Sequence, residues 1–414
     1  MSRLARLREE RARLVAECTS LNDKYGNKPM PKPEADRLDT LLGAVEAIDR
    51  DIEAEGANAA ASARPPATWS IDGSTVPVLR GSADIRRYYS RLPGVAASAP
   101  KVSLADFVRG VAGMPTTDAV RASLSEGTDT AGGYLVPSMV MPGVLEALVP
   151  ASSVLSAGAG IIPVAVGAKS FTQAAIDNIP TAAWRAENGN VAESDPTFRA
   201  AVATPRSLAF FFKVSRELLA DATNLEQALT IAVAQAFAKE LDRAALRGSG
   251  TAPEPRGVLN STSLGVNAVA NGANGASLAT TKFANLLSAY QLILEDNAPA
   301  PTAAIMSPRS RVVLGGLADS TGQPLQTPAM LEPVALLSTT QVPNDLSVGS
   351  SADCSEIYLG DFTNMAFMMR EQLSIQKVDQ LFATTGQMGF VCHARCDVML
   401  QYPKAFAVVT GVRP

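Results

Sequence analysis

The chain holds a single histidine, His393, which stands inside the run CHARC at residues 392–396. Thiolates and imidazole are zinc ligands, so this run is the first place where the sequence could do chemistry. On a strand, however, alternate side chains face opposite sides, so the two cysteines share one face and His393 lies on the other. A structural zinc site also needs a second ligand pair, which Cys18 and Cys354 do not form. We therefore interpret the run as part of a buried strand and predict neither a metal site nor a cofactor.

The carboxylates Glu193 and Asp195 are the other candidate pair. In a glycosidase such a pair needs a cleft with aromatic residues that stack on sugar rings, and only Trp184 and Phe198 are nearby in the sequence. One histidine also removes most acid–base and nucleophilic schemes that use imidazole. The motifs G-x-S-x-G, G-x-x-x-x-G-K-[ST], G-x-G-x-x-G and H-E-x-x-H are missing from the sequence. We predict a solvated or subunit-facing loop here, and a protein that is not an enzyme.

Composition restricts the class of protein further. Of the 414 residues, 47% are hydrophobic and 18% are charged, and 36 basic against 40 acidic side chains give a net charge of −4. No apolar run reaches the roughly 18 residues of a membrane span, so we predict no membrane contact. Because binding to phosphates needs a concentrated basic surface, we expect any DNA to be contained and not specifically bound. Four cysteines in so long a chain favour a reducing compartment without disulfides.

Residues 1–56 differ from the rest of the chain, because 22 of these 56 positions are charged. Apolar residues recur there at alternating spacings of three and four, which is typical of a coiled-coil seam. The seam consists of Leu38, Leu41, Val45, Ile48 and Ile52. The proline-rich run 22–33 cannot continue a helix and separates two segments with a helical pattern, so we predict a helical hairpin over 1–56. Residues 57–122 are predicted to be a flexible linker, because they are rich in Ala, Pro and Gly and, up to about residue 100, poor in periodic apolar residues. A short amphipathic helix is expected within this segment at Leu104–Val111.

The remaining residues, 123–414, predict an α+β body. Its clearest helix begins with a capping box at Thr223 and Glu226 and ends before Gly248. Strand-like and polar segments precede this helix, and the last stretch, 356–412, reads as several strands. These patterns favour a mainly antiparallel sheet.

Several segments of this body, taken in their order, resemble the major capsid protein of tailed bacteriophages with the HK97-like shell fold. The segments are TDTAGGYLVP (128–137), residues 186–198 ending in SDPTF, VSRELL (214–219), LRGSGTAPEPRGVLN (246–260), IMSP (305–308), LADSTGQPL (317–325), GDF (360–362) and AF (405–406). No single segment is very specific, but their order and spacing are. The resemblance covers about residues 123–412.

The resemblance implies a structural protein that assembles itself, as hexamers and pentamers, into an icosahedral shell around double-stranded phage DNA. It places the chain in the virion capsid, assembled in the host bacterial cytoplasm, with a portal and a maturation protease as partners. It also implies the parts of the body: an extended N-arm at about 123–160, an E-loop at about 165–212, a spine helix at about 223–247, an A-domain at about 265–390 and P-domain strands from about 391 to 412.

The resemblance assigns roles to further residues. Residues 1–56 are similar to a scaffolding delta domain, and cleavage on maturation is predicted at Arg121, Ala122 and Ser123. Contacts between subunits are expected from E-loop residues Trp184, Arg185, Glu187, Glu193, Asp195, Phe198 and Arg199. Family members that crosslink their subunits use an E-loop lysine, and the sequence has none between Ser170 and Phe212. A shell without covalent crosslinks is therefore expected.

Two other interpretations stay open at this point. An encapsulin-like bacterial nanocompartment shell has the same fold, although encapsulins typically lack a scaffolding hairpin such as 1–56. An intracellular enzyme with an unrecognised site would need a compact pocket with titratable groups.

Overall fold

The computed structural model divides the chain into two compact units, Met1–Pro65 and Pro66–Pro414. In the second unit it describes residues 67–71, 74–90, 104–112, 114, 120–121, 134–135, 141–164, 171–178, 197–215, 217, 225–319, 321–370, 374–378, 382 and 387–414. In the first unit it describes 13–15, 18, 19, 38, 41 and 48.

The backbone of the first unit is helical at every described position. The Thr19 hydroxyl donates to the Val15 carbonyl over 2.8 Å, a bond typical of a helix interior. Leu38, Leu41 and Ile48 of the predicted seam are helical and half-buried, while Val45 and Ile52 lie outside the described residues. Helical structure is thus found where it was expected, and the pairing of two helices stays a prediction.

Helix α9, Leu225–Arg247, is the long helix that the sequence predicts. Leu229, Val233, Phe237 and Leu241 follow each other at a spacing of four and are all buried, which fixes the face that packs on the core. Ala236, expected on this face, is exposed. Thr223 of the capping box lies outside the described residues.

One sheet of the second unit has seven strands in the order β11-β10-β13-β17-β8, with β12 beside β13 and β9 beside β17. These strands are β8 (Asn267–Ala270), β9 (Ala276–Ser277), β10 (Ala303–Met306), β11 (Ala335–Ser338), β12 (Leu346–Val348), β13 (Ser351–Gly360) and β17 (Phe406–Arg413). The helices α10 (Leu278–Thr281), α11 (Ala284–Glu295) and α12 (Pro308–Gly315) come from the same stretch of chain. Buried side chains of α11 and of the central strands share one hydrophobic core.

A second sheet has six strands in the order β3-β15-β16-β14-β4, with β7 along the other side of β16. They are β3 (Tyr134–Leu135), β4 (Gly160–Val164), β7 (Arg206–Ser215), β14 (Met365–Arg370), β15 (Ser374–Val378) and β16 (Gln387–Leu400). Among the described strands, β4, β8, β9 and β11 pair in parallel with a neighbour, and the other pairings are antiparallel. The expected α+β class with a mainly antiparallel sheet is confirmed.

The two sheets correct the predicted boundary between an A-domain at 265–390 and P-domain strands from 391. β14 and β15 pair with β16, so the chain returns to the second sheet after Gly360 and not near 391. It then returns through the short turn Pro403–Ala405 to β17, which belongs to the first sheet. This exchange depends on long-range pairing, which local sequence patterns do not encode.

The described parts of the predicted linker, 67–71, 74–90 and 104–112, are a second correction, because they are folded elements. They form β1 (Ala67–Ile71), β2 (Ser74–Val78), α3 (Ser82–Ser90) and α4 (Leu104–Val111). Leu79, next to β2, pairs with Ile161 of β4 through two 2.8 Å backbone hydrogen bonds. Ile85 and Phe107 are fully buried in the main core. The helix α4 has the bounds that the sequence predicts, whereas β1, β2 and α3 are too short to show a period, and their apolar residues become a core only against distant elements.

The predicted extended N-arm at 123–160 contains the strand β3, but most of its described length is helical. Residues 141–160 contain α6 (Met141–Ala151) and α7 (Ser153–Ser156), and α6 packs on α9. Asp242 of α9 holds the beginning of α7: its carboxylate accepts from the Ser152 hydroxyl at 2.5 Å and from the Ser153 amide at 2.8 Å. Burial raises the pKa of Asp242 although these bonds favour the charged form.

None of the described helices combines the length and the apolar composition that crossing a bilayer would need.

Candidate functional site

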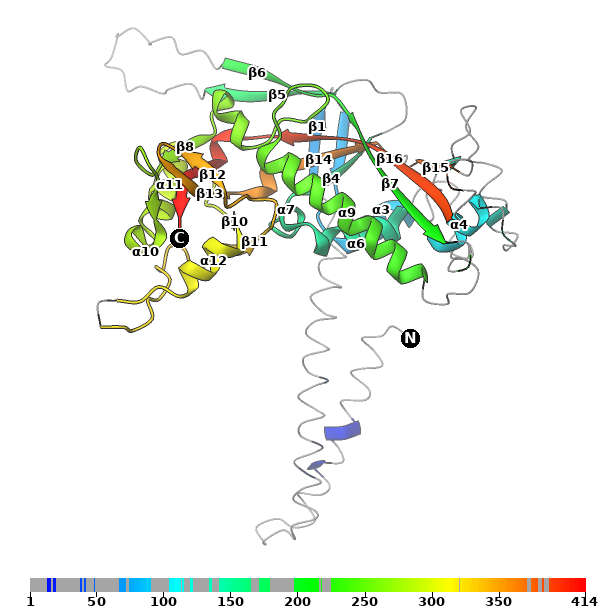
Figure 1. The fold of residues 1–414 in the computed structure, drawn as a ribbon, viewed down its shortest axis with the longest axis horizontal. Helices are drawn as coiled ribbons and strands as arrows, with labels where there is room; N and C mark the ends of the chain where they lie inside the picture. The colour runs from blue at the N-terminus through cyan, green and yellow to red at the C-terminus, as the bar shows by residue number, and fades with distance from the viewer. Residues whose placement is uncertain are drawn as a thin grey trace, which may run out of the picture. The chain divides into compact units, whose positions relative to one another are not determined.

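The strands β5 (Phe171–Asn178) and β6 (Thr197–Ala203) form an antiparallel hairpin that is a sheet of its own. Figure 1 shows both strands extending together, away from α9. A two-stranded ribbon cannot bury both of its faces by itself. Such an arm is therefore a candidate surface for contact with another molecule.

Most of the predicted contact residues lie in the sequence between β5 and β6. Trp184, Arg185, Glu187, Glu193 and Asp195 lie outside the described residues. Phe198 and Arg199 lie in β6. The Arg199 guanidinium donates to the Leu264 carbonyl of its own chain at 3.5 Å, which ties the hairpin to the body. Contact of these seven residues with a neighbouring subunit stays a prediction.

A small separate core fixes the base of the hairpin. Its buried members are Trp69, Val78, Ile162, Val164, Ala203, Ala366, Met368 and Met399. Trp69 of β1, only 4% exposed, is the largest of them, and Ala203 ends β6. The sequence analysis missed Trp69, although the apolar–polar alternation of ATWSI around it is a weak strand signal. The strands β1 and β2 therefore help to hold the hairpin.

A cavity of about 310 Å³ lies at the same base, where β6, β16 and the loop after α9 meet. Arg199, Arg206 and Arg256 line it, together with one carboxylate, Asp397. Asp397 accepts from the amides of Thr204 at 2.6 Å and of Val398 at 2.8 Å. Burial raises the pKa of Asp397, and the backbone bonds and Arg206 oppose that rise. The lining therefore carries more positive than negative charge.

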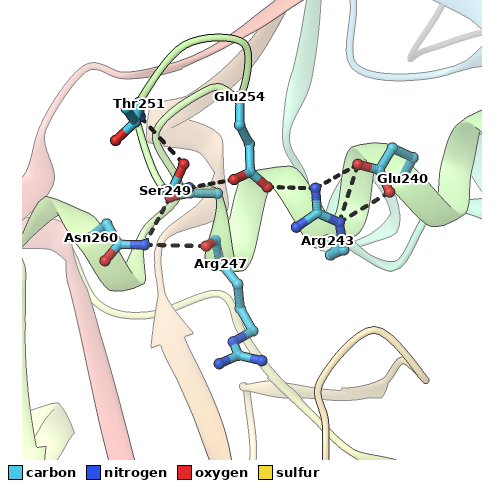
Figure 2. Close-up of polar contacts among 8 residues, drawn as sticks. Glu240, Arg243, Arg247, Ser249, Thr251, Glu254 and Asn260 are labelled. Atoms are coloured by element: carbon cyan, nitrogen blue, oxygen red, sulfur yellow. Dashed lines mark hydrogen bonds and ion pairs between the residues drawn. The ribbon is translucent and has the colours of Figure 1, made fainter. Parts of the chain in front are cut away.

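A network of charged and polar side chains holds the loop after α9 against the end of that helix (Figure 2). Arg243 lies between two carboxylates, 2.6 Å from Glu240 and 2.5 Å from Glu254. Hydrogen bonds to Glu240 chiefly raise the pKa of Arg243. A hydrogen bond with the Ser249 side chain chiefly lowers the pKa of Glu254, and the Arg243 guanidinium lowers it further. All the charges of this network are paired within the chain.

Asn260 and Gly248 complete the end of α9 in the same segment. The Asn260 amide donates to the carbonyls of Arg247 at 3.2 Å and Gly248 at 2.9 Å, groups that the helix end leaves without partners. A Cβ at Gly248 would stand 2.3 Å from the Pro255 carbonyl oxygen, so no larger residue fits. The motif LRGSGTAPEPRGVLN is thus explained by the geometry of a helix stop.

The CHARC run lies in β16 as predicted. Both of its cysteines are buried, whereas His393 is half-buried on the opposite face. Burial raises the pKa of Cys392 and of Cys396 to about 12, which keeps the thiols protonated and poor metal ligands. In the part of the chain that the structure describes, no three His, Cys, Asp or Glu side chains gather as a metal site would require.

The predicted cleavage position is only partly described. Arg121 is exposed and helical, and Val120 beside it is buried in the main core. Ala122 and Ser123 lie outside the described residues. The cleavage prediction relied on a flexible linker before it, and the packing of 67–111 removes that support.

The second unit can now be compared with known proteins. A model of the phage capsid family matches residues 132–411. The chain belongs to the phage capsid family. It is a structural major capsid protein, and its place is the capsid of a virion.

Solved capsid structures agree on the fold. The capsid of an empty GTA particle, computed with C5 symmetry, is 18% identical, with a TM-score of 0.50 over 63% of this chain and 90% of that chain. A structure described as Mycobacterium phage Adephagia is 17% identical, with a TM-score of 0.48 over 62% of this chain and 89% of that chain. No protein of the curated set matches the sequence. The HK97-like capsid fold is confirmed.

The family match begins at residue 132, after β1, β2, α3 and α4. These four elements belong to the packed body of this chain but lie outside the matched range. They are an addition to the part of the fold that the family model covers.

Proposed function

We propose that this chain assembles with copies of itself into the closed icosahedral shell of a tailed phage, built from pentamers and hexamers around double-stranded DNA. The family match over most of the second unit is the observation that carries the proposal. A GTA capsid described with C5 symmetry supports five-fold rings of a protein with this fold. Weak contacts suffice, because each subunit is held by several neighbours at once.

Electron microscopy of the purified full-length chain tests this proposal. We expect closed shells on the order of hundreds of ångströms across, as symmetric closure of many copies requires. Small oligomers at every protein and salt concentration would overturn it.

We further propose that residues 1–56 act as a scaffold during assembly. Their high charge, their helical conformation at every described position and their place in a separate unit support this role. A triple variant with Asp in place of Leu41, Val45 and Ile48 should give aberrant or absent shells, because charge at a coiled-coil seam prevents pairing. A matched variant with Asp at the polar positions Arg37 and Arg50 should assemble normally.

The remaining partners belong to the same proposal: a portal at one vertex and a maturation protease, with assembly in the host bacterial cytoplasm. The shell is proposed to be held without covalent crosslinks. Lys213, the first lysine after the E-loop, lies in β7 with its ammonium 5.7 Å from the Phe382 ring. Boiled particles should give a single band on a denaturing gel, and a ladder that survives reductant would contradict this part.

A further inference from the structure

The cavity at the base of the β5–β6 hairpin has room for part of another molecule. Its volume of about 310 Å³ corresponds to roughly ten water molecules at about 30 Å³ each. Val202, which lines it, is 59% exposed, so the cavity opens to the surface. It is therefore accessible in the isolated subunit.

The cavity presents guanidinium groups whose hydrogen bonds are incomplete. Arg206 gives one bond, from Nη2 to the Gly250 carbonyl at 3.3 Å, while its Nη1 is buried without a partner among the described residues. Arg256 is exposed, and it makes no side-chain hydrogen bond or ion pair with the described part of the chain. Buried donors without partners are costly and rare in folded proteins. The buried Arg206 Nη1 therefore indicates a missing acceptor, and the exposed Arg256 belongs to the same lining.

An oxyanion is the acceptor that fits these donors. Arginine binds carboxylates and phosphates through paired N–H groups, and such charge-assisted bonds are the stronger ones. The one acid of the lining, Asp397, accepts from the backbone amides of Thr204 and Val398 and attracts Arg206, but among the described residues no hydrogen bond or ion pair joins it to Arg206 or Arg256. Arg206 and Arg256 are thus left for an anion from outside.

The rest of the lining favours a peptide over a free ion. Val202, Leu264 and Met399 lie beside the arginines, so an occupant also meets apolar surface. A side chain carried on a peptide satisfies both needs, and in a shell the chain beside this surface is another copy. Resting on the proposed function, we propose that an Asp or Glu side chain of a second copy of this chain enters the cavity and is bound by Arg206 and Arg256.

Charge reversal tests the proposal. Arg256→Glu should raise the protein concentration needed for assembly by about tenfold or more, because it opposes a buried charge pair at each contact. The matched control is Arg311→Glu, an exposed arginine of α12 that lies outside the cavity lining. Thermal unfolding of the unassembled variants should agree with that of the wild type, since both side chains are exposed. Equal assembly of Arg256→Glu and Arg311→Glu would overturn the proposal.

A photo-crosslinking residue at Val202 gives a readout that does not depend on assembly yield. In assembled shells it should join the hairpin base to an Asp- or Glu-containing peptide of a second copy, identified by mass spectrometry. If shells form without this crosslink, the inference is overturned and the proposed function stands. If the wild-type chain forms no shells, the proposed function itself is overturned. Stabilisation of the unassembled wild type by inorganic phosphate, lost in Arg256→Gln, would show a free anion instead and also overturn it.

Discussion

Two groups of charged residues flank the same loop after α9, and they differ in how their charges are paired. On one side, Arg243 is shared between Glu240 and Glu254 (Figure 2). On the other side, the same loop gives Gly250 and Arg256 to a cavity in which the arginines exceed the acids. Charges that are paired within the subunit hold the fold, and charges left without partners are available to a neighbour. Variants on the two sides should therefore affect different measurements.

Asp242, a buried carboxylate that accepts three hydrogen bonds, should give the largest effect on stability. Its replacement by Ala leaves the buried Ser152 hydroxyl and the amides of Ser153 and Val154 without their acceptor. We expect a loss of about 3 kcal/mol or more in the free energy of unfolding of the body, measured with urea. Asp242→Asn keeps one acceptor oxygen and should lose clearly less. Equal losses in the two variants would contradict this account of the site.

The elements before residue 112 should remain in the mature particle. Removing them would expose the cores that contain Trp69, Ile85 and Phe107. We expect tryptic peptides from β1 and α4 in purified particles, detected by mass spectrometry. Phe107→Ala should cost about 3 kcal/mol, as other large core truncations do. A mature chain that starts after Arg121, with these peptides absent, would show that they are dispensable.

The pH dependence of stability separates the cavity from the paired network. The raised pKa of Asp397 means that the folded state binds more protons than the unfolded state between the ordinary aspartate pKa, about 3.9, and the raised value. The stabilising contribution of protonated Asp397 is complete below that ordinary pKa and is lost as pH rises through the raised one. Urea midpoints of Asp397→Asn should fall less steeply with pH there than those of the wild type. Parallel curves would contradict this.

Arg243 should give the smallest effect. Its side chain is 39% exposed, and exposed ion pairs contribute up to about 1 kcal/mol. Arg243→Gln should therefore lower the free energy of unfolding by at most about 1 kcal/mol and leave shell formation unchanged. A strong assembly defect in a stable Arg243→Gln protein would break the distinction between the two sides of the loop.

The sequence predicts the elements that are long and periodic. α9 appears with its end before Gly248, and α4 appears at Leu104–Val111, because their apolar residues repeat at the period of a helix. The elements β1, β2 and α3 escape prediction because each short piece buries its side chains only against remote elements. The cavity is equally hidden, since Arg206, Arg256 and Asp397 come together only through tertiary structure.

An electron cryo-microscopy map of shells assembled from the full-length chain tests the central claim most directly. The account predicts a closed shell in which a carboxylate of a second copy fills the cavity at the hairpin base and contacts Arg206 and Arg256. It also predicts that Arg243 keeps its two partners within its own subunit. A shell in which this cavity stays open to solvent while Glu240 or Glu254 contacts the neighbour instead would contradict it.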